Sequence, residues 1–458
     1  MELLMREIKS NLKVNEVYEI WKDKKDTIML DSSKEESEYS KFSFIGINPF
    51  IKIKSKENLV YLNENLVNKD VFELLNETIE SFSIDENLRK EIPFISGAIG
   101  YFSYDMGRAL EHIEESAIKD YEVYDSYFLF FHNLIIFDLL NDKIYITSLY
   151  EDKILSKNSL DYIEDKIINY KFEENNEKHR EVKENNLKSN FSKDEYIKAV
   201  DKMKDYIVEG HIYIANMTQR FLCDYEEDGY EIYKKLRKIN KAPFSAYLNL
   251  EDIEIMSSSP ERFLKVLNSK VETRPIKGTR PRGRNKEEDE LNKKELLNSE
   301  KDKSELLMIV DLERNDLSKV CKANSIKVTE LFKLEQYDTV FHLVSTVIGE
   351  LEEEESSVSC IKACFPGGSI TGTPKIRAME IIEELEGVRR GVYTGAIGYF
   401  DLRGNCDFNI VIRTIIKKGN QVSFGVGGGI TIESLSEMEY YETLDKAKAL
   451  IEVLKWFI

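Results

Sequence analysis

The hexapeptide Gly-Ala-Ile-Gly-Tyr-Phe occurs twice in this chain, at residues 97–102 and again at residues 395–400. Short runs of small, β-branched and aromatic residues are typical of buried strands. No fixed period relates the two copies to the rest of the chain, which excludes a solenoid of repeats. The recurrence predicts either two related core strands in two similar lobes, or two buried strands that reached the same composition independently.

Two apolar segments in the first half, Ile92–Phe102 and Tyr127–Phe137, are rich in β-branched and aromatic residues and predict buried strands. Residues 171–189 are polar, with many Asn, Glu and Lys, which indicates a linker or an exposed excursion. We therefore expect an N-terminal region over residues 1–170 and a second region over residues 190–458.

A strong helix signal opens the second region. Ser192 and Glu195 have the spacing of a capping box. Phe191 is placed to pack on Tyr196, and Gly210 ends the helical pattern. Beyond it we expect strands near Ile212–Phe221, Ser245–Leu250 and Val271–Arg274. A long helical stretch is expected to follow, from about Lys286 to Leu317.

The composition limits the classes of function. The 458 residues carry a net charge of −19, and such an acidic chain lacks the basic face that nucleic-acid binding needs. No apolar run approaches the ~18 residues of a membrane span, so no membrane association is predicted. The first residues lack the layout of a secretory signal, and the five cysteines are odd in number and dispersed. We expect a reduced, cytoplasmic protein.

Two glycine-rich segments resemble phosphate loops only at first sight. In residues 365–375, Thr373-Pro374 interrupts the P-loop pattern, and proline has no N–H to offer a phosphate. Thr373 is expected as a helix N-cap instead, with Pro374 as the first helical residue. Residues 425–430 have Ile430 where a dinucleotide fingerprint needs glycine. Their backbone amides can approach an anion closely, and a tight β-turn without a ligand is the alternative.

Two pairs of carboxylates share a spacing of three residues. Asp302 and Glu305 lie in one predicted helix, and Glu439 and Glu442 lie in another. Residues three apart occupy the same face of a helix. Two such pairs facing each other would form an oxygen site suited to Mg²⁺. The alternatives are solvated helix faces and, for Glu439, a capping box with Ser436.

These segments together resemble the chorismate-utilising enzymes, which include anthranilate synthase large subunits, aminodeoxychorismate synthases, isochorismate synthases and salicylate synthases. The matching motifs follow one another in order: Gly97–Arg108, Asn216–Phe221, Ser258–Phe263, Arg274–Arg280, Glu300–Asp316, Phe341–Val347, Phe365–Lys375, Arg390–Tyr399, Asp407–Thr414 and Gly425–Thr443. The resemblance implies an α+β fold with two large facing β-sheets and helices outside. It also implies that the two regions form one interlocked, two-lobed unit.

The resemblance gives these residues roles. It implies that Glu305 and Glu442 bind Mg²⁺ directly, and that Asp302 and Glu439 do so directly or through water. The metal would hold the ring carboxylate of chorismate. His342 resembles the active-site histidine of the family. The groups implied to bind the substrate are Tyr393, Arg413, Gly427, Gly428, Thr279 and Lys446.

Lys277 distinguishes between the sister enzymes. Anthranilate synthases usually carry Ala at the matching position, whereas aminodeoxychorismate synthases carry Lys. The resemblance therefore implies amination of chorismate at carbon 4 through a covalent lysine adduct at carbon 2, with Glu261 protonating the departing hydroxyl. Burial would favour the neutral amine and the protonated carboxyl that this chemistry needs. Anthranilate synthase component I is the alternative.

Other residues bear on the choice of reaction. Isochorismate and salicylate synthases use a Lys where this chain has Ile214, which disfavours activation of water. His211 and Ile214 also depart from the usual family pattern, so the local pocket is expected to differ. A catalytically silent binding subunit is a further alternative, which measurable turnover would remove.

The resemblance also implies partners. No glutaminase signature is recognised, so a separate glutamine amidotransferase is expected to supply ammonia, in the context of p-aminobenzoate and folate synthesis. Part of the chain resembles the region that binds tryptophan in the family, although the match is loose and a purely structural role is the alternative. Its residues are Ser32, Tyr39, Ser40, Lys41, Phe42, Pro243 and Phe244.

Overall fold

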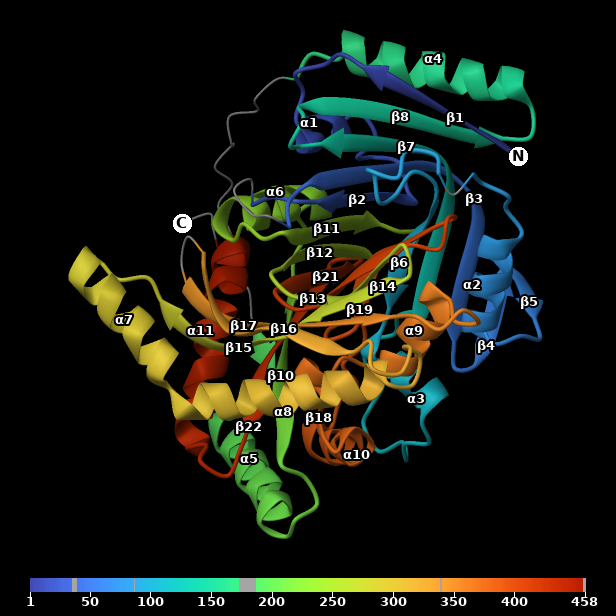
Figure 1. Cartoon of the computed structure of the whole chain (residues 1–458). Helices are drawn as coiled ribbons and strands as arrows, with labels where there is room; N and C mark the ends of the chain where they lie inside the picture. Colours follow the sequence, from blue (N-terminus) through green and yellow to red (C-terminus); the bar gives the residue numbers. More distant parts are fainter. Residues whose placement is uncertain (35–38, 86, 173–186, 338–339, 456–458) are drawn as a thin grey trace.

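The fold was analysed in a computed structural model that describes residues 1–34, 39–85, 87–172, 187–337 and 340–455 (Figure 1). Most of the polar segment expected to be a linker, residues 173–186, lies outside the described residues. Every ladder between the named strands is antiparallel. The predicted α+β fold is confirmed.

The strands, in chain order, are β1 (Glu2–Ile8), β2 (Thr27–Asp31), β3 (Phe42–Lys56), β4 (Leu59–Leu62), β5 (Asn65–Val67), β6 (Gly97–Phe102), β7 (Ser126–Asp138), β8 (Lys143–Tyr150), β9 (Lys188–Ser189), β10 (Ile214–Asp224), β11 (Phe244–Asn249), β12 (Glu254–Ser259), β13 (Arg262–Leu267), β14 (Lys270–Arg274), β15 (Ile276–Pro281), β16 (Lys327–Gln336), β17 (Val340–Glu350), β18 (Gly372–Thr373), β19 (Ala396–Asp401), β20 (Cys406–Ile410), β21 (Thr414–Lys418) and β22 (Gln421–Ile430).

The helices are α1 (Val14–Tyr18), α2 (Val71–Glu80), α3 (Gly107–Leu110), α4 (Lys153–Asn169), α5 (Lys193–Val208), α6 (Gly229–Ile239), α7 (Lys286–Asn298), α8 (Glu300–Leu317), α9 (Ser357–Cys364), α10 (Lys375–Glu386) and α11 (Ser436–Lys455). Two short 3₁₀ turns occupy Tyr104–Met106 and Gly368–Ile370.

The two expected sheets are continuous through the long strands β3 and β7. One sheet has the order β10-β22-β21-β12-β11-β2-β3-β7-β8-β1, and the other runs β7-β6-β19-β20-β13-β14-β17. The first half of β7 pairs with β6 and its second half pairs with β8. Each sheet combines strands from both regions of the chain, which meet where β2 pairs with β11 and where β6 pairs with β19.

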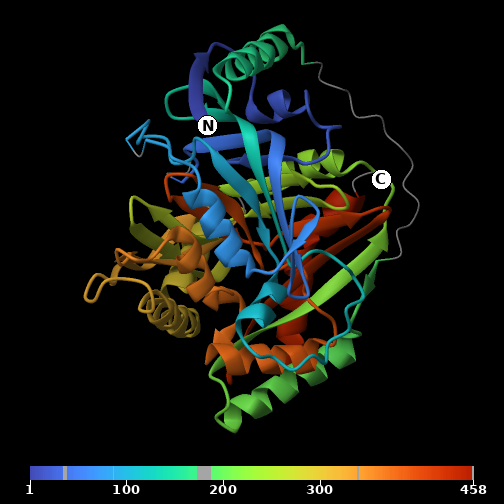
Figure 2. The same ribbon diagram turned by 90° about the vertical axis from the view of Figure 1, so that its right-hand side faces the viewer.

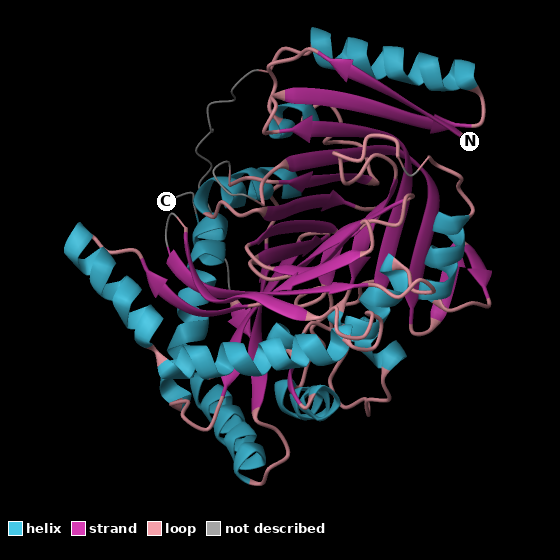
Figure 3. Cartoon of the chain, viewed as in Figure 1, coloured by secondary structure: helices cyan, strands magenta, loops and turns pink. Residues whose placement is uncertain are grey.

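A core of apolar side chains fills the space between the two sheets. It includes Leu248 on β11 and Ile255 on β12 from one sheet, and Ile99 on β6 and Tyr399 on β19 from the other. Separate apolar clusters lie under the helices on the outer faces. Figure 3 shows the helices around the outside of the strands, as predicted, and Figure 2 shows α5 and α10 side by side next to β10.

The two copies of the repeated hexapeptide pair with each other. In the β6–β19 ladder, Gly100 lies opposite Gly398 and Phe102 lies opposite Ala396. A Cβ atom on Gly100 would lie 2.0 Å from the carbonyl oxygen of Tyr127. A Cβ atom on Gly398 would lie 2.1 Å from the carbonyl oxygen of Asp407. Glycine at both positions therefore lets neighbouring strands come together at the middle of this sheet.

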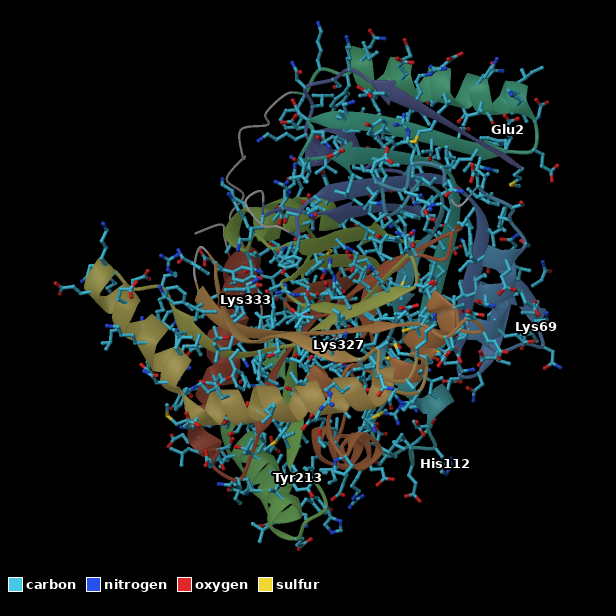
Figure 4. All side chains as sticks on the ribbon, viewed as in Figure 1. Glu2, Lys69, His112, Tyr213, Lys327 and Lys333 are labelled. Carbon is cyan, nitrogen blue, oxygen red and sulfur yellow. The ribbon has the colours of Figure 1, made fainter. Side chains whose placement is uncertain are left out.

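The edge strand β16 carries charged residues. Among the described strands it pairs only with β17, and its lysines Lys327 and Lys333 are labelled in Figure 4. Lysine on an edge strand disfavours the addition of a strand from another molecule.

The predicted start of α5 is confirmed, because its capping residues hydrogen-bond each other at the helix terminus. Ser192 caps α5 in a capping box with Glu195, and the rings of Phe191 and Tyr196 lie 5.7 Å apart. Gly210 follows the helix with φ of +81°.

The long helical stretch expected over Lys286–Leu317 consists of two helices. Ser299 separates α7 from α8, because its side chain accepts a hydrogen bond from the N–H of Asp302 and so caps a new helix.

Three other local expectations fail. Thr373 is not an N-cap: it lies in β18, Pro374 takes the N-cap position of α10, and no side chain caps that end. Ser436 does not cap α11 but is its first residue, with its hydroxyl bonded to Asp201. The glycines of residues 425–430 form a strand rather than a tight turn.

In the part of the chain that the structure describes, no helix is long and apolar enough to cross a membrane.

Candidate active site

Lys277 lies on β15 with its amine turned into the protein. Its Nζ donates a hydrogen bond to the carbonyl oxygen of Ser369 at 3.0 Å. Burial lowers the pKa of the Lys277 amine, and the carboxylates of Glu305 and Glu261 oppose this effect. A lysine with a lowered pKa has a larger neutral, nucleophilic fraction than a surface lysine at the same pH.

Glu261 lies just before β13 and is buried. The N–H of Ile276 donates to its Oε1 at 3.3 Å, and the side chain of Ser369 also acts on the carboxyl. Burial raises the pKa of Glu261, opposed by Ser369 and by the charge of Lys277. Because Ser369 contacts both groups, the Gly368–Ile370 turn holds an acid and an amine at one place.

Carboxylates from α8 and α11 face each other across Lys301. Its Nζ lies 3.4 Å from Oε1 of Glu439 and 3.8 Å from Oε1 of Glu305. Burial raises the pKa of Glu305 to about 6. Both Glu305 and Glu439 are buried, so the reading of these two residues as parts of solvated helix faces is wrong.

The remaining two carboxylates each form an ion pair with a basic side chain. Glu442 pairs with Lys446 at 2.7 Å, and this ammonium group is the main reason that the pKa of Glu442 is lowered. Asp302 pairs with Arg280 at 3.2 Å.

The donor chemistry of these four carboxylates fits a hard divalent cation. A Cβ atom on Gly428 would lie 3.4 Å from both Oε2 of Glu439 and Oε1 of Glu442, so these carboxylates converge on the glycine strand β22. Within the described residues, no three acidic, His or Cys side chains are yet close enough to hold a metal ion. Lys301 and Lys446 balance the acidic charge in this arrangement.

The amine of Lys277 and the carboxylate of Glu305 lie on the same side of strand β22, next to Gly429. A Cβ atom on Gly429 would lie 3.3 Å from Nζ of Lys277 and 3.5 Å from Oε2 of Glu305. Residues 424–430 pair with β10 on one side, and no described strand pairs with them on the other. Alternate N–H groups of this segment, which contains Gly427 and Gly428, therefore face away from β10.

His342 lies on β17 and is buried. Its Nδ1 lies 3.0 Å from the hydroxyl of Thr279, and its Nε2 has no hydrogen-bond partner among the described residues. Burial, followed by the charge of Arg413, lowers the pKa of His342 to about 3. The ring is therefore neutral near pH 7, with one nitrogen open to a ligand.

Arg413 and Tyr393 come from segments beside β20 and β19. Arg413 donates to Oδ1 of Asn240 at 2.8 Å and has a left-handed backbone with φ of +50°. Such backbone strain concentrates at functional sites. Tyr393 lies against Gly425, where a Cβ atom would be 2.2 Å from its ring. Burial raises the pKa of Tyr393, so its hydroxyl stays protonated.

Electrostatic contacts join these parts into one site. The amine of Lys277 interacts with Glu261, Glu305, Glu442 and Lys446. His342 interacts with Arg413 and also with Lys446. Lys446 itself donates to the carbonyl oxygen of Gly427 at 2.8 Å.

Sequence reasoning missed three residues at this site: Lys301, Ser369 and Glu313. Lys301 lies four residues before Glu305, a spacing that indicates an ion pair on a helix. Glu313 is an acidic residue on the buried face of α8, where apolar residues are the rule. Ser369 gives no local signal, because its role depends on contacts with distant segments.

The residues expected to bind tryptophan lie elsewhere, at a cavity of about 380 Å³. Six of the seven line it: Ser32, Tyr39, Lys41, Phe42, Pro243 and Phe244. Ser40 is buried but does not line the cavity. The guanidinium of Arg262 lies 4.8 Å from the ring centre of Phe244. Arg262 directly follows Glu261 in the sequence.

Comparison with known proteins places the chain among relatives of similar length. Aminodeoxychorismate synthase component 1 of Bacillus subtilis (strain 168) is 35% identical over 439 residues, covering 94% of this chain and 92% of that protein. Anthranilate synthase component 1 of Aquifex aeolicus (strain VF5) is 34% identical over 442 residues, covering 93% and 89%.

The fold agrees with solved structures. Anthranilate synthase component I from Streptococcus pneumoniae TIGR4 matches with a TM-score of 0.81 and 31% identity, covering 90% of this chain and 92% of that one. The isochorismate synthase MenF from Escherichia coli shares the fold, with a TM-score of 0.76 at 14% identity, covering 99% and 94%. The family described as chorismate binding enzyme matches residues 25–452. This chain belongs to the chorismate-binding enzyme family.

Proposed function

We propose that this chain is the chorismate-aminating component of a 4-amino-4-deoxychorismate synthase. The observation that carries the proposal is Lys277, a partly buried lysine whose amine has a lowered pKa, held through Ser369 beside a buried Glu261 with a raised pKa. Relatives in Bacillus subtilis and Escherichia coli, at 35% and 36% identity, are named aminodeoxychorismate synthase component 1.

In the proposed reaction the neutral Lys277 amine adds to ring carbon 2, the two conjugated ring double bonds shift, and the carbon-4 hydroxyl leaves as water with a proton from Glu261. The adduct is a secondary ammonium. Ammonia then attacks carbon 4, both double bonds shift back, and Lys277 leaves as a neutral amine. The new ammonium returns its proton to Glu261, so the net change is replacement of hydroxyl by amine with release of water.

The remaining site residues would bind the substrate carboxylates. Arg413 supplies a planar guanidinium fork, and the open N–H groups around Gly427 and Gly428 can donate to the same carboxylate. Tyr393, His342, Thr279 and Lys446 add further polar contacts. A magnesium ion bound by Glu305 and Glu442, with Asp302 and Glu439 directly or through water, would neutralise the ring carboxylate.

The proposal includes a separate glutamine amidotransferase that supplies ammonia. The relatives' designation as component 1 supports this arrangement. Ammonium salts at alkaline pH should replace the partner, because they supply free ammonia.

The purified chain should be incubated with chorismate, Mg²⁺ and ammonium at alkaline pH, and the products followed by mass spectrometry and fluorescence. We expect a non-aromatic aminated product that a lyase converts to p-aminobenzoate. The Lys277→Met variant should lose this activity by ~10³-fold or more, since removing a covalent nucleophile costs several orders of magnitude.

Anthranilate synthase component I is the second candidate, favoured by the relatives of that name at 34% to 36% identity. Its product is aromatic and fluorescent. Anthranilate formation with unchanged rate in Lys277→Met would establish this second reaction. No turnover with either ammonium or a glutaminase partner would indicate a silent binding subunit.

We also propose that the 380 Å³ cavity binds tryptophan. The aromatic rings of Tyr39 and Phe244 suit the side chain of an aromatic amino acid, and the guanidinium of Arg262 suits its carboxylate. Calorimetric titration with tryptophan tests this proposal, and absence of heat at millimolar concentration would leave the cavity a structural feature.

A further inference from the structure

Glu313 is a buried carboxyl that the proposed reaction does not use. It lies on α8, eight residues after Glu305, with 3% of its surface exposed. Its Oε1 accepts a hydrogen bond from the N–H of Gly368 at 3.0 Å. Its Oε2 lies 3.4 Å from the hydroxyl of Thr273, which donates to it.

The two segments that Glu313 joins are the two that hold the reacting groups. Gly368 adjoins Ser369, whose carbonyl oxygen accepts from Lys277 and whose side chain acts on the carboxyl of Glu261. Thr273 lies on β14, four residues before Lys277, and the strand continues toward Ile276, whose N–H donates to Glu261. One carboxyl therefore fixes the Gly368–Ile370 turn and the β14–β15 segment relative to each other.

The packing around Gly368 leaves little room for another arrangement. A Cβ atom there would lie 2.8 Å from Cδ2 of Leu312 and 2.9 Å from Oε1 of Glu313. The turn rests directly on α8, so without Glu313 the buried N–H of Gly368 would lose its acceptor. A buried donor without a partner is costly and favours movement of the segment that carries it.

The charges around Glu313 are consistent with an acceptor role. Burial, followed by the charge of Asp316 on the same helix, raises the pKa of Glu313 to about 7, and Glu261 acts in the same direction. Lys375 from α10 lowers it, but its ammonium bonds Asp316 and the carbonyl oxygen of Cys364. A carboxyl accepts the Gly368 N–H whether it is ionised or protonated.

We propose that Glu313 is a positioning residue that holds the Gly368–Ile370 turn against β14, and through Ser369 sets the placement of Lys277 and Glu261. This inference rests on the proposed function only for the part that concerns turnover. The placement of the Lys277 amine can be tested without any substrate.

The test compares Glu313→Leu, which removes the acceptor, with Glu313→Gln, which keeps an acceptor oxygen without the charge. Asp311→Leu, at an exposed position of the same helix, is the matched control. The pH dependence of Lys277 carbamylation by cyanate, followed by peptide mass spectrometry, reports the environment of the amine. We expect Glu313→Leu to move the midpoint toward that of an ordinary lysine, near ~10.4. Glu313→Gln and the control should keep the wild-type midpoint.

Turnover with ammonium is measured on the same proteins. We expect kcat to fall by ~100-fold in Glu313→Leu with little change in KM for chorismate, as for a reacting group misplaced by about 1 Å. Glu313→Gln should stay within a few-fold of wild type. A Glu313→Leu protein with lower Tm but unchanged carbamylation midpoint and kcat would overturn the proposal, because Glu313 would then be only structural.

Thr273→Val is the second variant if Glu313→Leu does not fold. Valine is nearly isosteric with threonine but lacks the hydroxyl that donates to Oε2 of Glu313. We therefore expect a smaller shift of the carbamylation midpoint in the same direction. An unchanged midpoint would overturn the proposal. If Lys277→Met turns over chorismate normally while Glu313 variants still shift the carbamylation of Lys277, the proposed function fails and the positioning role remains.

Discussion

Burial shifts the pKa values of Lys277 and Glu261 in opposite directions, and both shifts favour the neutral form of the side chain. It lowers the pKa of the amine and raises the pKa of the carboxyl, because in both cases the charged form loses its hydration. Each residue is thereby moved toward its neutral state. Neutral amine and protonated acid are the forms that nucleophilic addition and protonation of a leaving hydroxyl require.

This residue-level balance predicts a bell-shaped dependence of kcat on pH. Activity should rise as Lys277 loses its proton and fall at higher pH as Glu261 loses its own. Glu261→Gln should lower kcat by roughly 10²–10⁴-fold, the usual contribution of a general acid. Initial rates of chorismate amination between pH 5 and 10, at a fixed concentration of free ammonia, provide the measurement. A flat wild-type profile would contradict the assignment of both groups.

Glu313 predicts a pH dependence of stability. Its pKa is about 7 in the folded protein against an ordinary value of 4.5, so between these values the folded state binds more protons than the unfolded state. The free energy of unfolding therefore falls as pH rises through this window. Glu313→Gln removes the effect, and its stability relative to wild type should be higher at pH 8 than at pH 4.5 by about 3 kcal/mol. Urea unfolding at both pH values measures this, and an equal difference at both would refute it.

At the scale of elements, α8 and α11 bring three carboxylates, those of Glu305, Glu439 and Glu442, to the glycines of β22. Lys301 compensates two of them in the described structure. A divalent cation that binds there should raise Tm, since a ligand at 100 times its Kd stabilises the folded state by about 2.7 kcal/mol. Thermal unfolding in Mg²⁺ and in EDTA makes the comparison without any assay of activity.

We expect Glu305→Gln to lose the Mg²⁺-dependent rise in Tm while its Tm in EDTA stays close to wild type. Glu300→Gln, at an 86% exposed position of the same helix, is the control and should keep the rise. A full rise in Glu305→Gln would place the cation elsewhere.

The elements also show what a sequence can predict. The start of α5 was predictable because Ser192 and Glu195 bond each other within the helix. The break at Ser299 was missed because polar, helix-favouring residues continue on both sides of it. The glycines of β22 suggested a turn, yet pairing with β10 over ten residues holds them in a strand.

The same limit applies to the candidate site. Lys277, Glu261 and the acidic pairs could be named because each lies in a recognisable motif. Ser369 and Glu313 could not, because their contacts join segments 40 to 92 residues apart. Such contacts depend on the assembled sheets rather than on any local pattern.

At the scale of the whole molecule, neither region of the chain contains a complete sheet. Strand β11 pairs with β2, and β19 pairs with β6. We therefore predict that residues 187–458 expressed alone will not fold, because one of the two partners of each of these strands would be missing. Separately encoded fragments 1–172 and 187–458, expressed together, should form a complex with the circular dichroism and Tm of a folded protein. A soluble, cooperatively unfolding 187–458 fragment would contradict the prediction.

The antiparallel contact between the two copies of Gly-Ala-Ile-Gly-Tyr-Phe has a consequence for synthesis in the cell. Phe102 lies opposite Ala396, so a nascent chain must add about 300 residues after β6 before β19, the second neighbour of that strand, is available to pair with it. At translation rates of roughly 5–20 residues per second this interval is about 15–60 s. Throughout it, an apolar strand edge remains unpaired beside the ribosome, where a chaperone can bind it.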